Sequence, residues 1–260
     1  MTNWPALDLH AHIDAAINPQ ELLNLRAVIF AASRSLKESQ TALSRQTRDL
    51  LTVWGVGVHP GLKSALDDYD PEVFNGLIDK SACVSEIGLD AKAPSRLGQQ
   101  HEVLESILSQ LQQKPRLTSI HSYGTSVEIV DKLNQIPITG AILHWWLGDK
   151  ASTIRALDLG AYFSINASNL RHSDALELIP TDRLLLETDH PDGNRGGRRP
   201  RQPGSVSEIE IALAQSRGLS AASFRLQLWK NLASLVMETD TKHLLPPRVA
   251  AIADVASSSA

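Results

Sequence analysis

Short apolar runs alternate along the chain with longer segments in which apolar residues recur at helical spacing. The runs occupy residues 6–10, 27–32, 50–59, 82–89, 117–121, 141–146, 161–166 and 183–188. Their length and near-continuous hydrophobicity are typical of strands buried on both faces of a parallel sheet. The pattern therefore predicts eight buried strands.

Helical periodicity fills most of the intervals between these runs. Thr125 and Asp149 stand where two of the expected helices begin and are candidate N-caps. The interval after the second run is short and poor in helical signal. The helices that the spacing predicts cover residues 99–113, 125–134, 150–159, 205–217 and 221–237.

Eight strands separated by helices favour a (β/α)8 barrel, an α/β fold that here fills residues 1–245 as one domain. A doubly wound open sheet has similar elements, and strand counting alone does not separate the two folds. Residues 246–260 are rich in alanine and serine, and we expect them to form a frayed or loosely docked C-terminal tail.

Charge, cysteine content and the length of the apolar runs argue against several classes of function. The net charge of −4 gives no basis for nucleic-acid binding by bulk charge, although a local patch could still bind it. Cys83 is the only cysteine, which excludes an intrachain disulfide and a thiolate zinc site. The first residues lack a basic segment followed by an apolar run, and no run is long enough to cross a membrane. We therefore expect a cytoplasmic protein with no membrane partner.

Histidines and acids stand at the ends of the predicted strands. Barrel enzymes place their active sites at the carboxyl ends of the strands, so side chains from distant parts of the sequence meet there. A single histidine closing a strand is more often structural, but several in successive strands favour a metal site. The residues at or just after strand ends are His10, Glu86, His121, His144 and Asp189.

His12 lies two residues after His10, so the two imidazoles face the same side of an extended chain. Glu86 and Asp189 are costly to bury unless they are paired or bind a cation. A glutamate can bridge two cations, whereas an aspartate can bind one and also accept a proton from water. Glu187 would face the same way as Asp189 and is expected to hold a histidine in place.

Three further features are candidates for substrate contact. His59 ends the third run and could contact the substrate or a leaving oxygen; a structural role is nearly as well supported. Trp145 and Trp146 could stack on a base, although aromatic residues at strand ends more often pack in the core. The loop after the last run could bind phosphate or be merely solvated, and its arginines are Arg195, Arg198, Arg199 and Arg201.

The chain resembles TatD-type metal-dependent deoxyribonucleases from about residue 6 to residue 237. The resemblance lies in six ordered blocks on compatible strand ends, which is far more specific than one motif. One block is the strand end at His121; the others are DLHAHID, GVHPG, SEIGLD, LHWWLGD and LLLETDHP.

This resemblance implies a barrel of the amidohydrolase kind that hydrolyses phosphodiester bonds in DNA with two divalent ions (zinc, manganese or magnesium). It implies that one ion is held by His10, His12, Glu86 and Asp189. The second ion would be held by Glu86, His121 and His144. Asp189 and Glu86 are the expected catalytic residues, with Asp189 taking a proton from the attacking water.

The chain departs from the family pattern at several points that concern the substrate. Tryptophans follow His144 where the family more often has smaller residues, His190 follows Asp189, and the loop after EIGLD is short and lacks the usual aromatic residue. The helix-poor interval after the second run, with the segments TSIHS and HWWLGD, is most similar to the TatD-like member of Qat antiphage defence cassettes. This similarity implies other defence proteins as partners.

Two alternatives remain open from the sequence. The same site could remove D-amino acids from mischarged tRNA, which is hydrolysis of a carboxylic ester. The barrel could also be a partner-dependent or non-catalytic subunit of a defence complex, although the complete set of candidate ligands argues against this.

Overall fold

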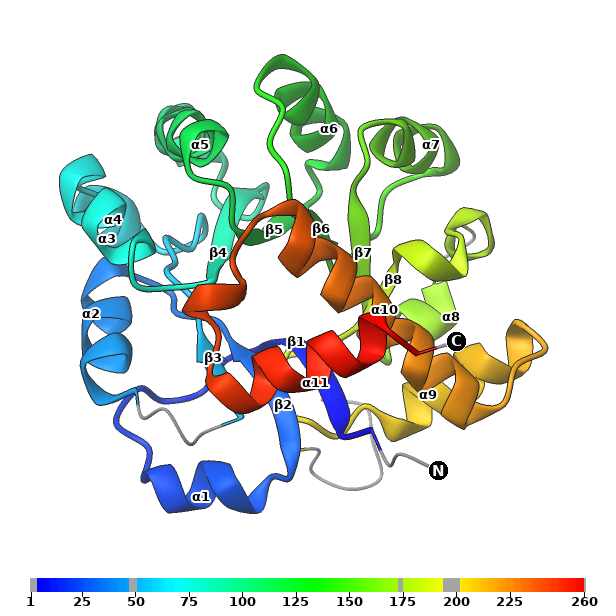
Figure 1. The fold of residues 1–260 in the computed structure, drawn as a ribbon. Helices are drawn as coiled ribbons and strands as arrows, with labels where there is room; N and C mark the ends of the chain where they lie inside the picture. Colours follow the sequence, from blue (N-terminus) through cyan, green and yellow to red (C-terminus); the bar gives the residue numbers. More distant parts are fainter. Residues whose placement is uncertain (1–3, 47–50, 173–174, 194–201, 260) are drawn as a thin grey trace.

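A ring of parallel strands lies inside a circle of helices in the computed structural model of the chain, which describes residues 4–46, 51–172, 175–193 and 202–259 (Figure 1). Each predicted apolar run contains one strand. The strands are β1 (Ala6–Ala11), β2 (Ala27–Ala31), β3 (Thr52–Trp54), β4 (Cys83–Asp90), β5 (Leu117–Tyr123), β6 (Ala141–His144), β7 (Tyr162–Ile165) and β8 (Leu184–Leu186).

The strands form two parallel sheets, β1-β2-β3 and β4-β5-β6-β7-β8, whose edges meet to close a barrel. At one junction, Val56 just after β3 bridges to Val84 of β4. At the other junction, the Asp189 amide donates to the His10 carbonyl at 2.8 Å, so the chain after β8 pairs with β1. These contacts confirm the (β/α)8 barrel and reject an open doubly wound sheet.

Helices cover the outside of the ring and pack apolar faces against it. The longest of those that join strands, α5, buries Val103, Leu104, Ile107, Leu108 and Leu111, which is the face expected from its spacing. The helices are α1 (Pro19–Asn24), α2 (Leu36–Arg45), α3 (Lys63–Asp67), α4 (Pro71–Ile78), α5 (Leu97–Gln113), α6 (Ser126–Gln135), α7 (Lys150–Asp158), α8 (Asn169–His172), α9 (Ser207–Ser216), α10 (Ala221–Glu238) and α11 (Pro247–Ser257).

Only one of the two predicted N-caps makes its bond. The Asp149 side chain accepts from the Ser152 amide at 2.7 Å and caps α7. Thr125 makes no capping bond to α6, because its hydroxyl donates to the Leu89 carbonyl at 3.1 Å instead.

Helix α2 corrects the expectation of a helix-poor interval after the second strand. Ser35 caps it by accepting from the Glu38 amide at 3.2 Å, and Ser39 and Ala42 are buried on its inner face. Small and polar residues on that face weaken the apolar periodicity, which is why the sequence pattern missed the helix.

The third apolar run forms a much shorter strand than its length predicts. At Gly57 the chain passes so close to the segment after β2 that an added Cβ would lie 1.7 Å from the Ser33 carbonyl oxygen. The Val58 amide donates to the Glu86 carbonyl at 2.8 Å, so the segment leaves β2 and crosses toward β4. His59 therefore lies in the loop after β3 and does not end a strand.

The C-terminal segment expected to be frayed forms helix α11 instead. Val249 and Ala256 are fully buried and belong to the main hydrophobic core. Alanine favours helix, and the apolar residues at 249, 253 and 256 share one face that packs beside α10. Figure 1 shows α10 and α11 crossing in front of the strands.

Helix α10 contacts the amino ends of β1 and β8. The Trp229 indole donates to the Pro5 carbonyl at 2.9 Å, just before β1. The Asn231 amide group donates to the carbonyls of Thr181 and Leu184 at 2.8 and 2.7 Å, where β8 begins. This helix closes the end of the barrel opposite to the strand ends that carry the candidate ligands.

Within the described part of the chain, the helices are all too short or too polar to traverse a lipid bilayer.

Candidate metal centre

The six candidate ligands converge at the carboxyl end of the barrel. His10 lies in β1 and His12 directly follows it, His144 is the last residue of β6, and Asp189 lies beyond β8. Glu86 and His121 lie inside their strands, because β4 and β5 stay paired up to Asp90 and Tyr123. Five strands thus supply one buried cluster.

The two oxygens of Glu86 face different groups of histidines. Oε1 lies 2.5 Å from His121 Nδ1 and 2.9 Å from His144 Nε2. Oε2 lies 3.3 Å from His12 Nε2 and 3.8 Å from His10 Nε2. The carboxylate therefore stands between two sets of donor atoms.

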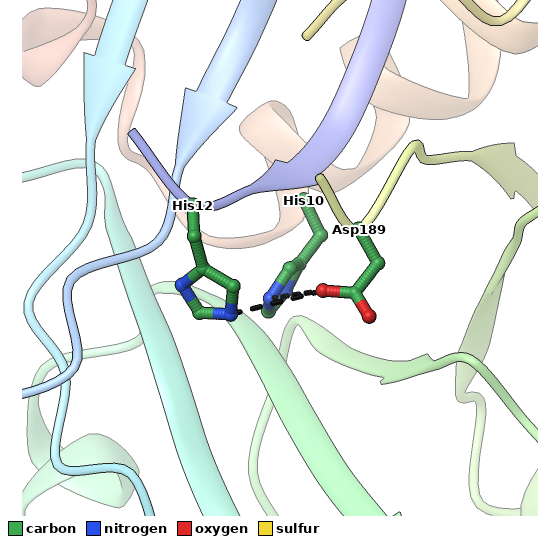
Figure 2. Close-up of side chains that lie close together, drawn as sticks. All are labelled: His10, His12 and Asp189. Atoms are coloured by element: carbon green, nitrogen blue, oxygen red, sulfur yellow. Dashed lines mark ion pairs between the residues drawn. The ribbon is translucent and has the colours of Figure 1, made fainter. Parts of the chain in front are cut away.

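Asp189 completes the set around His10 and His12. Its Oδ1 atom lies 3.8 Å from His10 Nε2 and 3.7 Å from His12 Nε2. Figure 2 shows the three side chains pointing toward one another from β1 and from the segment after β8. Their ligand-type atoms all lie within 4.8 Å of one another, a grouping able to hold a metal ion.

Hydrogen bonds on the far side of each ring orient the histidines. The Ala32 carbonyl lies 3.1 Å from His12 Nδ1 and requires the proton there, which leaves the Nε2 lone pair facing the cluster. The Ser119 hydroxyl lies 2.7 Å from His10 Nδ1 and fixes that ring. Ser119 was not identified from the sequence, because a serine within a strand carries no distinctive signal.

Two carboxylates support the histidines on the other side of Glu86. Glu187 Oε1 lies 3.5 Å from His144 Nδ1, which matches the supporting role expected for it. Asp90 Oδ2 lies 3.3 Å from His121 Nε2. Asp90 was missed from the sequence, although its even spacing from Glu86 on one extended strand places both on the same face.

His59 also reaches the cluster, with Nε2 at 3.5 Å from Glu86 Oε2. The Gly61 amide donates to His59 Nδ1 at 3.0 Å, so the proton of the neutral ring is on Nε2. Geometry alone would allow His59, Glu86 and His121 to hold a metal. The tautomer set by Gly61 favours donation by His59 to an oxygen over metal ligation.

Burial and mutual charge shift the pKa values of these groups strongly. Burial raises the pKa of Glu86, but His59, His121 and His144 outweigh it and hold that pKa well below its usual range. Burial lowers the pKa of His144, but Glu187 and Glu86 raise it well above the usual value. Burial raises the pKa of Asp189 to about 6.

The buried carboxylate of Asp8, in β1, forms hydrogen bonds to the chain that follows β8. Asp8 is fully buried and accepts from the Thr188 amide at 2.8 Å and the Thr188 hydroxyl at 2.7 Å. It also accepts from the Gly204 amide at 2.7 Å. Asp189, next to Thr188, has a φ of 41°, a left-handed conformation that costs a non-glycine residue about 1–2 kcal/mol. The bonds of Asp8 help to hold this strained backbone in place.

The residues of the cluster fit a divalent metal. His10 Nε2 and Glu86 Oε2 are buried and make no hydrogen bond in the described part of the chain. Such atoms are costly to bury without a partner, and imidazole nitrogens with carboxylate oxygens are the donors that zinc, manganese and related ions take. A cation at these atoms would satisfy them.

The cluster forms one wall of a cavity of about 440 Å³. Trp145 lines it, whereas Trp146 is fully buried, packs against Phe163 and donates to the Thr153 hydroxyl at 2.8 Å. Trp146 is therefore a core residue, as aromatic residues at strand ends more often are, and it offers no stacking surface. The predicted phosphate-binding residues Arg195, Arg198 and Arg199, together with Arg201, lie outside the described residues.

Comparison with known proteins agrees with this geometry. The model of the TatD-related DNase family matches residues 7–237. The chain belongs to the TatD family. It is accordingly a TatD-family metal-dependent hydrolase, with a cluster compatible with metal binding.

Relatives of this TatD-family chain carry related descriptions. It is 29% identical over 201 residues to the uncharacterized metal-dependent hydrolase YcfH of Escherichia coli K12, covering 70% of this chain and 73% of that protein. It is 25% identical over 188 residues to the putative deoxyribonuclease TATDN3 of Mus musculus, covering 66% and 64% of the two proteins.

Solved structures show the same fold. The TatD homologue YjjV of Escherichia coli K12 superposes with a TM-score of 0.75 at 22% identity, covering 88% of this chain and 97% of that one. A TatD-family hydrolase of Entamoeba histolytica gives a TM-score of 0.72 at 17% identity, covering 90% and 99%.

Proposed function

We propose that this TatD-family hydrolase cleaves phosphodiester bonds in DNA with two divalent ions, both of which Glu86 would help to hold. The observation that carries the proposal is the division of the Glu86 oxygens, Oε2 toward His10 and His12 and Oε1 toward His121 and His144. Asp189 would join the first pair. Zinc, manganese or magnesium are the candidate ions.

Divalent ions bound there would polarise a phosphoryl oxygen and lower the pKa of a water molecule. Asp189 accepts the proton from the attacking water at a carboxylate oxygen. The bond between phosphorus and the leaving oxygen breaks, and water supplies the new phosphorus–oxygen bond.

His59 contributes a hydrogen bond to the substrate in this proposal. Its Nε2 proton, set by the Gly61 amide, faces the cavity at the cluster. Burial lowers the pKa of His59, so the ring is a neutral donor near pH 7. It can donate to a phosphoryl oxygen or to the leaving oxygen. The arginine loop is proposed to hold flanking phosphates.

The test is hydrolysis of labelled single-stranded and duplex DNA with Mg²⁺, Mn²⁺ or Zn²⁺, alongside bis-p-nitrophenyl phosphate as a minimal phosphodiester. Glu86→Ala and Asp189→Ala are expected to lower the rate by on the order of a thousandfold. The control Glu102→Ala removes an exposed carboxylate of α5 and should keep the wild-type rate.

Wild type that binds metal but cleaves neither DNA nor the minimal phosphodiester contradicts the proposal. Release of D-amino acids from mischarged tRNA by the same preparation would then identify carboxylic esters as the substrate. Failure to bind Zn²⁺ or Mn²⁺ at all would favour a non-catalytic barrel.

A role in an antiphage cassette, with other defence proteins as partners, remains a proposal supported by the segments TSIHS and HWWLGD alone. Helix α2 removes one of its supports, the helix-poor interval after β2. If the proposal is right, a strain carrying the full cassette loses phage resistance when Glu86→Ala replaces wild type. Resistance that persists in that strain contradicts it.

A further inference from the structure

We propose that Lys92 and Tyr123 form a subsite for the nucleotide beside the scissile phosphate, in which Lys92 binds its phosphate and Tyr123 stacks on its base. The inference rests on the proposed phosphodiesterase function. It concerns the rim of the cavity above β4 and β5, where neither residue is one of the six candidate metal ligands.

The charge of the cavity points to Lys92. The described residues that line it include four carboxylates, on Glu86, Asp90, Asp189 and Asp192, and Lys92 is the only lysine or arginine among them. Even with cations at the cluster, a polyanion that extends beyond the reacting phosphate needs a positive group at the rim. In the described part of the lining, Lys92 is the side chain that can supply it.

Tyr123 presents an aromatic ring at the same place. It lines the cavity yet is 45% exposed, which is unusual for a large ring at the end of a buried strand. The Lys92 ammonium lies 4.0 Å from the centroid of this ring. A cation–π contact at an exposed site is weak, so a phosphate can draw the ammonium away while a base takes its place on the ring.

The backbone holds both residues in fixed positions. The Ala91 amide donates to the Tyr123 carbonyl at 2.9 Å, and the Lys92 amide donates to Asp90 Oδ1 at 2.7 Å. Buried Gln100 accepts from the Asp90 amide at 2.7 Å and pins the loop to α5. A subsite built on a fixed backbone loses little entropy when it binds.

The same loop links the subsite to the cluster. Asp90 Oδ2 lies 3.3 Å from His121 Nε2, while its other oxygen holds the Lys92 amide. Tyr123, opposite Asp90 in the register of β5 with β4, supplies a ring at this rim from the neighbouring strand.

The experiment compares wild type with Tyr123→Leu, which removes the ring, and Tyr123→Phe, which keeps it. The substrates are a single-stranded oligothymidylate, an abasic oligonucleotide of the same length, and bis-p-nitrophenyl phosphate. Tyr123→Leu is expected to raise KM for oligothymidylate about tenfold more than for the other two substrates. Tyr123→Phe should restore most of the affinity.

Lys92→Met and Lys92→Arg test the cation separately, with exposed Lys80→Met as the matched control. Lys92→Met is expected to raise KM about tenfold for both oligonucleotides relative to the minimal phosphodiester. It should also reduce the slope of log KM against log salt concentration by about 0.7. Lys92→Arg should restore both values.

Equal losses on all three substrates, or no loss in an active enzyme, would overturn the subsite and leave the phosphodiesterase proposal standing. A wild type inactive on every phosphodiester overturns the proposed function instead. In that case fluorescence anisotropy of labelled oligothymidylate, with Mn²⁺ present, compares the same variants, and unchanged binding by Tyr123→Leu and Lys92→Met overturns the subsite.

Discussion

Glu86 illustrates how one residue can organise a whole site. It is almost fully buried, yet the histidines around it hold its pKa well below the usual range, so the carboxylate stays charged. The neighbouring His144 and His121 have raised pKa values, despite burial, because carboxylates face both rings. These shifts favour the protonated form of two rings that a metal would need as neutral ligands.

Metal binding should release protons for this reason. An ion bound by His121 and His144 needs both rings neutral, and their raised pKa values oppose this, so we expect about one to two protons released and an affinity that rises with pH. Calorimetric titration with Mn²⁺ in two buffers of different ionisation enthalpy measures the number. Glu187→Gln, which removes one cause of the raised His144 pKa, should reduce the release. Identical enthalpies in both buffers contradict the prediction.

The sequence predicts which residues gather at the site better than how they are held. His10, Glu86, His121, His144 and Asp189 stand at or near strand ends, and barrel topology alone brings them together. The supporting contact between His10 and Ser119 spans 109 positions and depends on the register of the closed ring. No local pattern encodes such a contact, which is why Ser119 and Asp90 were not found.

At the scale of elements, segments with a regular apolar pattern were predicted correctly, whereas helices that bury small or polar residues were not. The alternating runs and the amphipathic face of α5 gave correct elements, because burial on a sheet demands continuous apolar residues. Helix α2 buries small and polar residues, and α11 buries mainly alanine and valine. Their sequences resemble loop or tail because composition hides which face they bury.

Helix α10 provides a test of how an outer helix holds a strand. Asn231 is buried and bonds two carbonyls where β8 begins, so Asn231→Ala leaves two backbone acceptors without their donor. We expect the free energy of unfolding to fall by about 1–3 kcal/mol. Urea denaturation measures it. Met237→Ala, at a 76% exposed position of the same helix, should change it by less than about 0.5 kcal/mol. Equal effects in the two variants contradict the assigned role.

At the scale of the whole molecule, the cluster joins distant parts of the ring. Its ligands come from β1, β4, β5, β6 and the segment after β8, so they span the junction that closes the barrel. A bound ion holds these strands together only in the folded state. Metal affinity is therefore also a contribution to folding stability.

Saturating metal should stabilise the fold in proportion to its affinity. With free Mn²⁺ or Zn²⁺ at a hundred times Kd, the free energy of unfolding is expected to rise by about 2.7 kcal/mol over the chelated protein. Urea denaturation with and without a chelator measures the difference. Glu86→Gln, which weakens the shared ligand, should show a smaller gain. A wild type whose stability ignores the metal contradicts the prediction.

The position of α10 against the amino ends of the strands has a consequence for how substrate enters the site and product leaves it. With that end of the barrel covered, substrate and product share the opening at the opposite end, beside Tyr123 and Leu147. A product that stays bound at the cluster prevents the next substrate from binding, because both use the same opening. The turnover rate then depends on the rate of product release as much as on the rate of bond cleavage.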